Sequence, residues 1–175
     1  MAGDIKYKYA AASTAVTVTN LHSLASHQTW LAGWTSNTVN NTSNNYLDYL
    51  YGGTFTTHAS NRQAGVINVF VVAFLNDTPT IPAVSSGTLG TEGAVTFADT
   101  YRRNSLVRQI AGIEVDATPS VIYTFPATGI RQFFGREMPP YHCLFVTQNA
   151  ATTTAAGLAA AGSAIYYTPV TRQYT

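Results

Sequence analysis

The chain has 175 residues, of which 10% are charged, and its formal net charge is +1. This length supports one domain with a buried core. Its charged fraction lies well below the usual share of about a quarter, and the absence of a cationic excess excludes the basic surface of a nucleic-acid-binding protein. The solvent-facing positions must be filled mainly by Thr, Ser, Asn and Gln, which gives little repulsion between copies. Both assembly with other protein chains and an ordinary neutral surface fit this composition.

The single cysteine, Cys143, excludes an internal disulfide. Residues 1–10 contain Asp4 and two lysines and have no apolar core, so we expect no secretory signal. The Ala-rich run 150–165 is interrupted by Thr, Gly and Ser and is too short to span a membrane. We therefore expect a protein that is made in a reducing cytoplasm and has no membrane partner.

Residues 1–12 are expected to form an N-terminal arm, followed by a single domain over residues 13–175. Within the arm, alternate positions carry like side chains: Lys6 and Lys8 on one parity, Tyr7 and Tyr9 on the other. In an extended conformation the two pairs point to opposite faces. Such an arm is either frayed or paired with a sheet edge, on this molecule or on another.

Two short segments follow the arm. The alternation of apolar and polar residues over 15–20 predicts a strand with one buried face. Segment 27–34 holds Trp30 and Trp34, which share a strand parity but would also lie on one face of a helix, so its class stays open.

The Asn/Thr/Ser-rich stretch 35–45 is predicted to be a loop. Segment 45–57 is predicted to be a strand pair or one bent strand, because Gly52 and Gly53 permit a bulge or a tight turn. Segment 65–76 is apolar on both strand parities and rich in β-branched and aromatic residues, which favours an interior strand covered on both faces.

The second half of the chain continues the pattern of strands and turns. We expect a long loop over 76–93, a mobile low-complexity loop over 150–163 and a tail over 169–175. Further strands are predicted at 94–101, 106–116, 121–125, 141–147 and 164–168. About eight strands without a long helix indicate an all-β fold. The predicted architecture is an antiparallel β-sandwich, a single jelly roll with an N-terminal arm and long loops.

Titratable residues are few and scattered, which argues against a catalytic site. His142 and Cys143 are adjacent on a predicted strand and so point to opposite faces, which is poor geometry for a nucleophile and its base. His22 and His27 have no neighbouring Cys or carboxylate at metal-ligand spacing. We therefore predict no catalytic residue, no metal site, no cofactor and no enzymatic activity.

Two groups of residues could form recognition surfaces. The tryptophans Trp30 and Trp34, with the tyrosines of segment 45–57, either line a binding face or pack in the core. The arginines either contact acidic groups of a partner or form surface ion pairs within the chain. The cationic candidates are Arg102, Arg103, Arg131 and Arg136.

Two stretches resemble small virion proteins of tailed bacteriophages. The first is Asn76-Asp77-Thr78-Pro79-Thr80-Ile81-Pro82 after the apolar strand. The second is Phe133-Phe134-Gly135-Arg136-Glu137-Met138-Pro139-Pro140-Tyr141-His142-Cys143-Leu144-Phe145-Val146-Thr147-Gln148-Asn149. Both are similar to head cement, or decoration, proteins with one jelly-roll domain, and the resemblance covers the chain from Gly52 onward. His142-Cys143 and the Ala-rich loop depart from the pattern.

The resemblance implies a virion protein on the capsid surface that performs no reaction. Its partner would be the major capsid protein, which it would bind where shell subunits meet, as a dimer or trimer. The predicted contact residues are Lys6, Tyr7, Lys8, Tyr9, Trp30, Trp34, Arg102 and Arg103. Two alternatives stay open: a carbohydrate-binding jelly roll of a tail or host-attachment protein, with the two tryptophans as its platform, and the major capsid protein itself.

Overall fold

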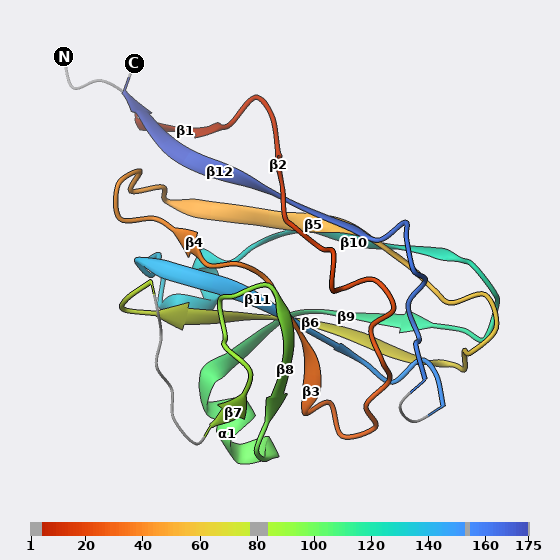
Figure 1. The fold of residues 1–175 in the computed structure, drawn as a ribbon. Helices are drawn as coiled ribbons and strands as arrows, with labels where there is room; N and C mark the ends of the chain where they lie inside the picture. The colour runs from red at the N-terminus through yellow and green to blue at the C-terminus, as the bar shows by residue number, and fades with distance from the viewer. Residues whose placement is uncertain (1–4, 78–83, 153–154, 175) are drawn as a thin grey trace.

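The computed structural model describes residues 5–77, 84–152 and 155–174, and these form two antiparallel β-sheets packed face to face (Figure 1). The first, here the arm sheet, contains β1 (Ile5–Tyr9), β2 (Thr14–Ala15), β5 (Asp48–Thr56), β10 (Ile122–Gly129) and β12 (Ala164–Tyr174). The second, here the central sheet, contains β3 (Ala32–Thr35), β4 (Val39–Asn40), β6 (Gly65–Phe74), β7 (Ser85–Ser86), β8 (Gly93–Phe97), β9 (Val107–Val115) and β11 (Tyr141–Gln148). Two short helices complete the fold: α1 (Thr100–Leu106) and the 3₁₀-helix η1 (Arg131–Phe134). The predicted all-β sandwich is confirmed.

The strand order is β1-β12-β5-β10 in the arm sheet, with β2 also paired to β12. In the central sheet it is β7-β8-β3-β11-β6-β9, with β4 also paired to β11. Strands that follow one another in the chain often lie in opposite sheets, as β5 and β6 do, and likewise β9 and β10.

Strand β6 is covered on both faces, as its sequence predicts. Ile67, Val69 and Val71 belong to the core between the two sheets. Phe70, Val72 and Phe74, on the other parity, belong to a second core on the outer face of the central sheet. β6 is therefore an interior strand with an apolar core against each of its faces.

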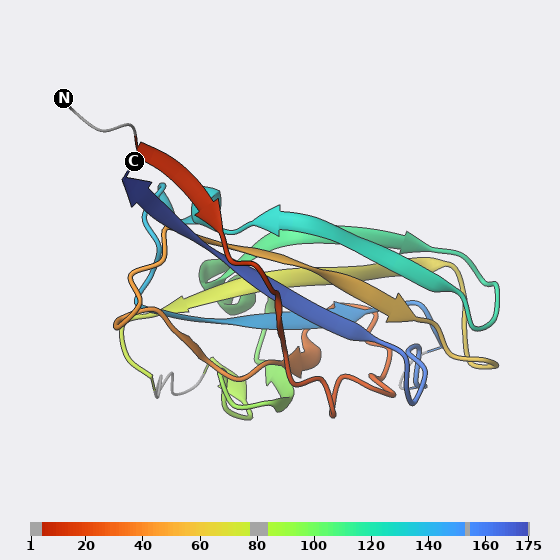
Figure 2. The ribbon, with the colours of Figure 1, turned by 90° about the horizontal axis from the view of Figure 1, so that it is seen from above.

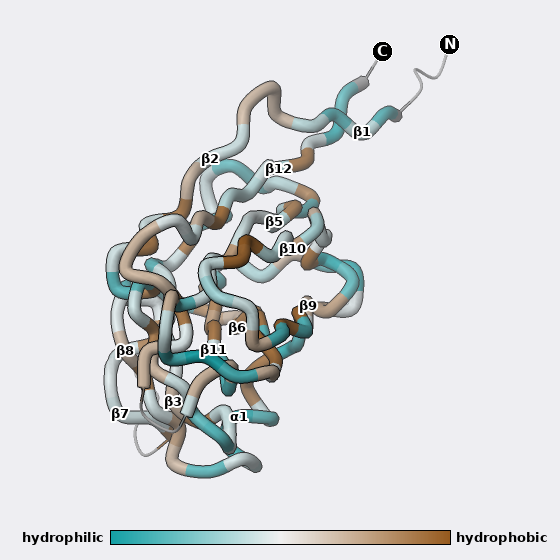
Figure 3. The backbone as a smooth tube through the Cα atoms, turned by 90° about the vertical axis from the view of Figure 1, so that its right-hand side faces the viewer, coloured by the Kyte–Doolittle hydropathy of each residue, from teal (hydrophilic) through white to brown (hydrophobic). Residues whose placement is uncertain are grey.

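The second core is shielded from solvent by β8 and by the loop that precedes it. Val95 and Phe97 of β8 pack there with Leu89, and the Phe97 ring meets the Phe145 ring edge-on at a centroid distance of 5.0 Å. Figure 1 shows β7, β8 and α1 on the side of β6 and β11 that faces away from β12 and β5. The tube coloured by hydropathy shows the same layers from the side, with β1 and the end of β12 projecting beyond them (Figure 3).

Segment 45–57 forms one continuous strand, β5, and not a strand pair. The irregularity lies on the neighbouring strand: the register between β10 and β5 shifts between Phe125 and Thr128. Gly53 allows the backbones of β5 and β12 to approach closely, because a Cβ at this position would lie 2.0 Å from the carbonyl oxygen of Ala164. β12 can therefore pair with β5 at this point only if the position is glycine.

The predicted strand over 15–20 is much shorter in the structure, because only Thr14 and Ala15 lie in β2. Their partners on β12 are Tyr167 and Tyr166, and the Val16 amide still donates to the Ile165 carbonyl at 2.9 Å. β12 begins at Ala164, so no further backbone is left for the next residues to pair with.

The prediction of a C-terminal tail over 169–175 is wrong for its described part, since β12 continues to Tyr174. Val170 pairs with Asp48 of β5, and residues 170–174 pair with β1. Pro169 lacks an N–H donor, but its carbonyl accepts a hydrogen bond from the Ala10 amide at 3.0 Å. The N-terminal arm is thus paired within the chain.

The described parts of the two long loops are packed against the domain. In the Ala-rich segment 150–163, expected to be mobile, Ala150, Ala151 and Leu158 are fully buried. In the loop over 76–93, Leu89 is buried, and the Pro-containing residues 78–83 lie outside the described residues. Small side chains are what allow the first of these segments to lie close to the core.

Candidate functional site: a cationic ribbon and groove

The last part of β12 continues beyond the strand that supports it. β5 pairs with β12 only as far as Val170, and β1 pairs with β12 from Val170 to Tyr174. Residues Ile5–Tyr9 and Val170–Tyr174 therefore form a two-stranded projection, here called the ribbon. Figures 1 and 2 show β1 and the end of β12 extending past the body of the sandwich.

The register of the ribbon separates its side chains into two faces, because directly opposed residues share a face. Lys6 and Lys8 pair with Gln173 and Thr171 on one face. Tyr7 and Tyr9 pair with Arg172 and Val170 on the other. The ribbon holds three cationic residues, Lys6, Lys8 and Arg172, and no acidic residue.

Both tyrosines of the ribbon are largely exposed, Tyr7 at 65% and Tyr9 at 57%. Large aromatic side chains in solvent are uncommon, and Tyr is enriched at the anchoring positions of protein interfaces. The lysines are exposed as well. Every described side chain of β1 is thus available for contact with another molecule.

A groove runs from the tyrosine face of the ribbon onto the end of the sandwich. Its first part is a cavity of about 190 Å³ between Tyr7, Tyr9, Leu50 and Arg131. A second cavity of about 530 Å³ shares Tyr7, Asp48 and Arg131 with the first and adds Gln132 and Arg136. A third of about 310 Å³ brings in Arg172 and Glu137.

Asp48 fixes the floor of the groove. Its Oδ1 accepts hydrogen bonds from the backbone amides of Tyr49 at 2.8 Å, Ile130 at 3.0 Å and Arg131 at 2.9 Å. These bonds hold the start of η1 against β5. Gly129 permits the approach, because a Cβ there would lie 2.5 Å from Asp48 Oδ2.

The loop that follows η1 lines the groove and is fixed by a hydrogen bond from a side chain to the backbone. Arg131 Nε donates to the Arg136 carbonyl oxygen. Gly135 and Arg136 both have positive φ angles, 67° and 73°. Gly adopts this conformation readily and Arg does not, so the fold imposes it on Arg136.

Cationic residues are concentrated at this end of the molecule. Five of the nine Lys and Arg residues lie on the ribbon or in the groove. They are Lys6, Lys8, Arg131, Arg136 and Arg172. Among the described residues, no carboxylate oxygen lies within 4.0 Å of a charged side-chain nitrogen of any of these five. The acidic residues in the groove are Asp48, already bonded to three amides, and Glu137. A partner with acidic groups would complement this surface.

The predicted contact residues separate into three places. Lys6, Tyr7, Lys8 and Tyr9 lie together on the ribbon. Trp34 is fully buried in the core between the sheets, and its Nε1 donates to Glu92 Oε1 at 2.7 Å. An exposed role for Trp34 is therefore wrong, and packing is the interpretation that holds.

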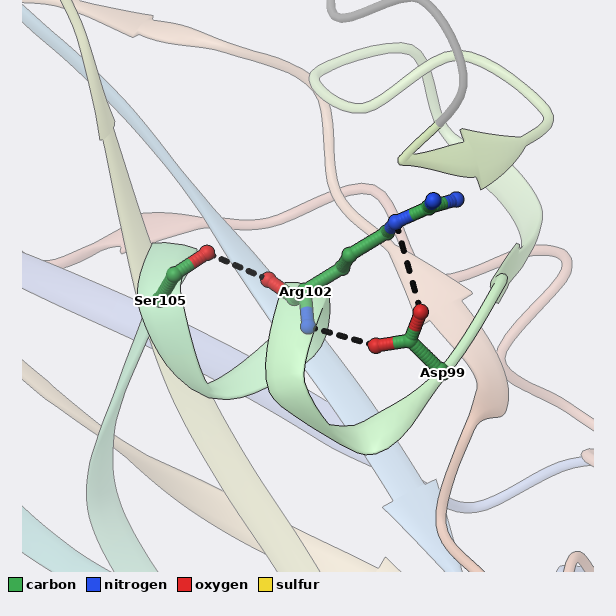
Figure 4. A network of polar contacts seen from close by, with 3 residues as sticks. All are labelled: Asp99, Arg102 and Ser105. Carbon is green, nitrogen blue, oxygen red and sulfur yellow. Dashed lines mark hydrogen bonds and ion pairs between the residues drawn. The ribbon is translucent and has the colours of Figure 1, made fainter.

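Arg102 lies on α1 in an ion pair, with Nε 3.3 Å from Asp99 Oδ2 (Figure 4). Asp99 also caps the helix, since its Oδ1 accepts the Arg102 backbone amide at 2.8 Å, and Ser105 Oγ donates to the Arg102 carbonyl at 2.8 Å. Of the two interpretations of Arg102, the surface ion pair is the one found.

Arg103 is only 8% exposed and lines a separate cavity with Trp30, so it does not form an open contact surface.

Arg172 and Asp48 were not among the predicted residues. Arg172 falls in the segment expected to be a tail, and its alternation with Val170 was the signal that could have placed it in a strand. Asp48 gives no signal in sequence, because two of its three amide donors, Ile130 and Arg131, lie more than 80 residues away in the chain.

The pair His142 and Cys143 is divided between the two cores, as strand geometry predicts. His142 is fully buried and its Nε2 lies 2.9 Å from the Tyr51 hydroxyl; burial lowers its pKa to about 3. Cys143 packs in the second core, where burial raises its pKa to about 12. At neutral pH the imidazole is uncharged and the thiol is protonated, and they do not face one another.

Within the described residues, no group of three or more His, Cys, Asp or Glu side chains is arranged to hold a metal ion. No helix in that part of the chain is long and apolar enough to cross a membrane. No protein-family model, no curated protein and no solved structure matches this chain.

Proposed function

We propose that this chain is a non-enzymatic structural protein of a virion, a cement protein that binds the outside of a phage capsid where major capsid subunits meet. One observation carries the proposal: in a chain with 10% charged residues, five of the nine cations gather on a projecting ribbon and its groove. A surface of this kind suits attachment to a larger, acidic protein surface.

The ribbon offers backbone as well as side chains. Past Val170, β12 is paired with β1 and with no other described strand, and β1 pairs only with β12. Unpaired strand edges recruit strands from other chains, with hydrogen bonds that depend little on side-chain identity. Charge would then select the partner, and Tyr7 and Tyr9 would anchor it.

The order of the strands supports the jelly-roll part of the proposal. With β1, β4, β7 and β8 left aside, β2-β12-β5-β10 faces β3-β11-β6-β9, and the chain crosses from one sheet to the other between β2 and β3, β5 and β6, β9 and β10, and β11 and β12. Two four-stranded sheets linked by such crossings are the arrangement expected of a jelly roll. Domains of viral capsids and of lectins use that fold.

Several copies on one shell would add their contacts. A small ribbon and a shallow groove give modest affinity for one site, and linked sites gain avidity without new contacts. A dimer or trimer of this chain would place two or three ribbons on adjacent shell subunits. A purified chain that closes into shells without a second protein would instead be the major capsid protein.

A single charge reversal tests the proposal. Lys8→Glu on the ribbon should lower binding to empty capsids of the virus that encodes the chain by about 10-fold or more, since it replaces an attractive contact by a repulsive one. Arg108→Glu, the same charge change at the start of β9, is the matched control and should leave binding unchanged. Cosedimentation at two salt concentrations measures both. Equal loss in the two variants, or no binding by the unaltered chain, contradicts the proposal.

A further inference from the structure

A separate cavity of about 300 Å³ lies on the outer face of the central sheet, beside α1. Trp30 and Phe70 supply its aromatic surface, Asn68, Asn104 and Gln109 its amide groups, and Arg103 its charge. None of these residues lines the groove below the ribbon. What this cavity binds is therefore a question independent of the proposed attachment to a capsid.

Trp30 is held in an unusual state. Its φ angle is +53°, in the left-handed region that a bulky side chain rarely adopts. Its indole Nε1 is shielded from solvent and has no hydrogen-bond acceptor among the described residues. Buried donors are nearly always paired, and strained backbone positions persist where the surroundings enforce them, often at binding sites.

Arg103 is buried and has only neutral partners in the described part of the chain. Its Nη1 donates to the carbonyls of Thr29 at 3.3 Å and Trp30 at 3.1 Å. Its Nε and Nη2 donate to Asn104 Oδ1 at 3.0 and 2.8 Å. These bonds fix the guanidinium, whose carbon lies 5.8 Å from the centre of the Phe70 ring. A fixed cation without an anion makes the cavity attractive to a negatively charged group.

The amide groups leave further bonding capacity. Gln109 Nε2 donates to Asn68 Oδ1 at 2.9 Å, which orients both side chains. Their remaining groups, Asn68 Nδ2 and Gln109 Oε1, have no partner within the described residues, and neither has Asn104 Nδ2. The cavity therefore presents several N–H donors, one carbonyl acceptor and one cation beside an aromatic surface.

We propose that this cavity binds one carboxylated sugar unit, a uronic acid, of a glycan. The carboxylate complements Arg103, the ring hydroxyls accept from the side-chain amide N–H groups and donate to Gln109 Oε1, and the C–H face of the sugar packs on the aromatic surface. A cavity of this size, at the lower end of ligand sites, accommodates one small unit. A carboxylate without hydroxyls would leave the amides unused, and a neutral sugar would leave the cation unpaired.

The chain carries its own probe for the test. It has two tryptophans, and the indole N–H of Trp34 is fixed to Glu92 in the core. In a ¹⁵N-labelled full-length chain, titration with glucuronic acid should shift the Trp30 indole resonance to saturation and leave that of Trp34 in place. Trp30→Phe assigns the two resonances. Glucose should bind about 10-fold more weakly, as should benzoate, since each lacks one of the two recognised groups.

Asn104→Asp gives the sharpest variant, because it sets a carboxylate of almost unchanged shape against Arg103. Affinity for glucuronic acid should fall about 10-fold or more, while the spectrum stays dispersed as in the unaltered chain. Asn61→Asp, in the loop before β6, is the charge-matched control and should bind normally. An unmoved Trp30 resonance at the highest glucuronic acid concentration overturns the proposal. So does equal affinity for benzoate, which would indicate recognition of a carboxylate alone.

Discussion

The ribbon and the central sheet are both antiparallel β-structure, yet they use their side chains in opposite ways. In β6 and β11 residues of both parities are buried, in two separate cores. In β1 every described side chain is exposed, and pairing with β12 joins the strand to the rest of the molecule. The central sheet therefore supplies stability, and the ribbon is free to change its side chains for binding.

Truncation of one aromatic residue in each region should show this difference most clearly. Phe145→Ala removes a ring that packs against both Phe97 and Phe70 in the second core, and should cost about 3–5 kcal/mol of the free energy of unfolding. Tyr7→Ala on the ribbon should change it by less than about 0.5 kcal/mol. Urea denaturation followed by circular dichroism measures both. Similar losses in the two variants would break the comparison.

The buried His142 makes the stability of the core depend on pH. Its pKa falls from 6.5 to about 3 on folding, because burial disfavours the charged ring. Between these values the unfolded chain binds a proton that the folded chain does not, so this contribution is present above pH 6.5 and is lost as the pH falls toward 3.

The unaltered chain should therefore lose up to about 1.4 kcal/mol per pH unit from this group across that window. His142→Gln, which keeps a polar group near the Tyr51 hydroxyl, should remove that part of the slope although it lowers stability overall. Denaturant midpoints at several pH values measure the difference between the two proteins. Parallel pH profiles would show that the pKa of His142 is the same in the folded and the unfolded chain.

Deletion of residues 1–12 separates the two roles of the ribbon. It removes β1 and leaves β12 paired with β5 and β2, so the domain should fold with a loss of no more than about 1 kcal/mol. Capsid occupancy should fall about 10-fold or more, because the lysines and tyrosines leave together. Cosedimentation with capsids and a melting curve are the two measurements. Unchanged occupancy in a folded variant would remove the arm from the proposed contact.

The strands with the strongest patterns were predictable from sequence. β6 carries β-branched and aromatic residues on both parities, and its two cores follow directly from that. The class of segment 27–34 was not predictable, since Trp30 ends a turn with a positive φ angle and Trp34 lies in β3. Local pattern contains no information on this difference, which depends on α1 holding Trp30 through Arg103.

Of the two strands of the ribbon, only β1 was predictable from sequence. The alternation of Lys and Tyr over residues 6–9 indicated an extended arm, but Pro169 made the C-terminal segment resemble an irregular tail. Pairing between β1 and β12 joins residues more than 160 positions apart, as Lys8 and Thr171 show. The groove depends on the same long-range pairing, because β5, β10 and the ribbon meet only once the strands of the arm sheet have paired.

The smallest expected effect concerns α1, which lies beside β6 and β11 on the side that faces away from β12 and β5 (Figure 1). Asp99→Ala removes both the cap on the Arg102 amide and the ion pair, and should cost about 1 kcal/mol. Asp99→Asn keeps an oxygen that accepts from the same amide and loses only the charge, so it should cost a few tenths of a kcal/mol, within the range of exposed ion pairs. Urea midpoints of the two variants measure the difference. A loss from Asp99→Asn as large as that from Asp99→Ala would mean that charge, and not capping, holds this helix in place over the second core.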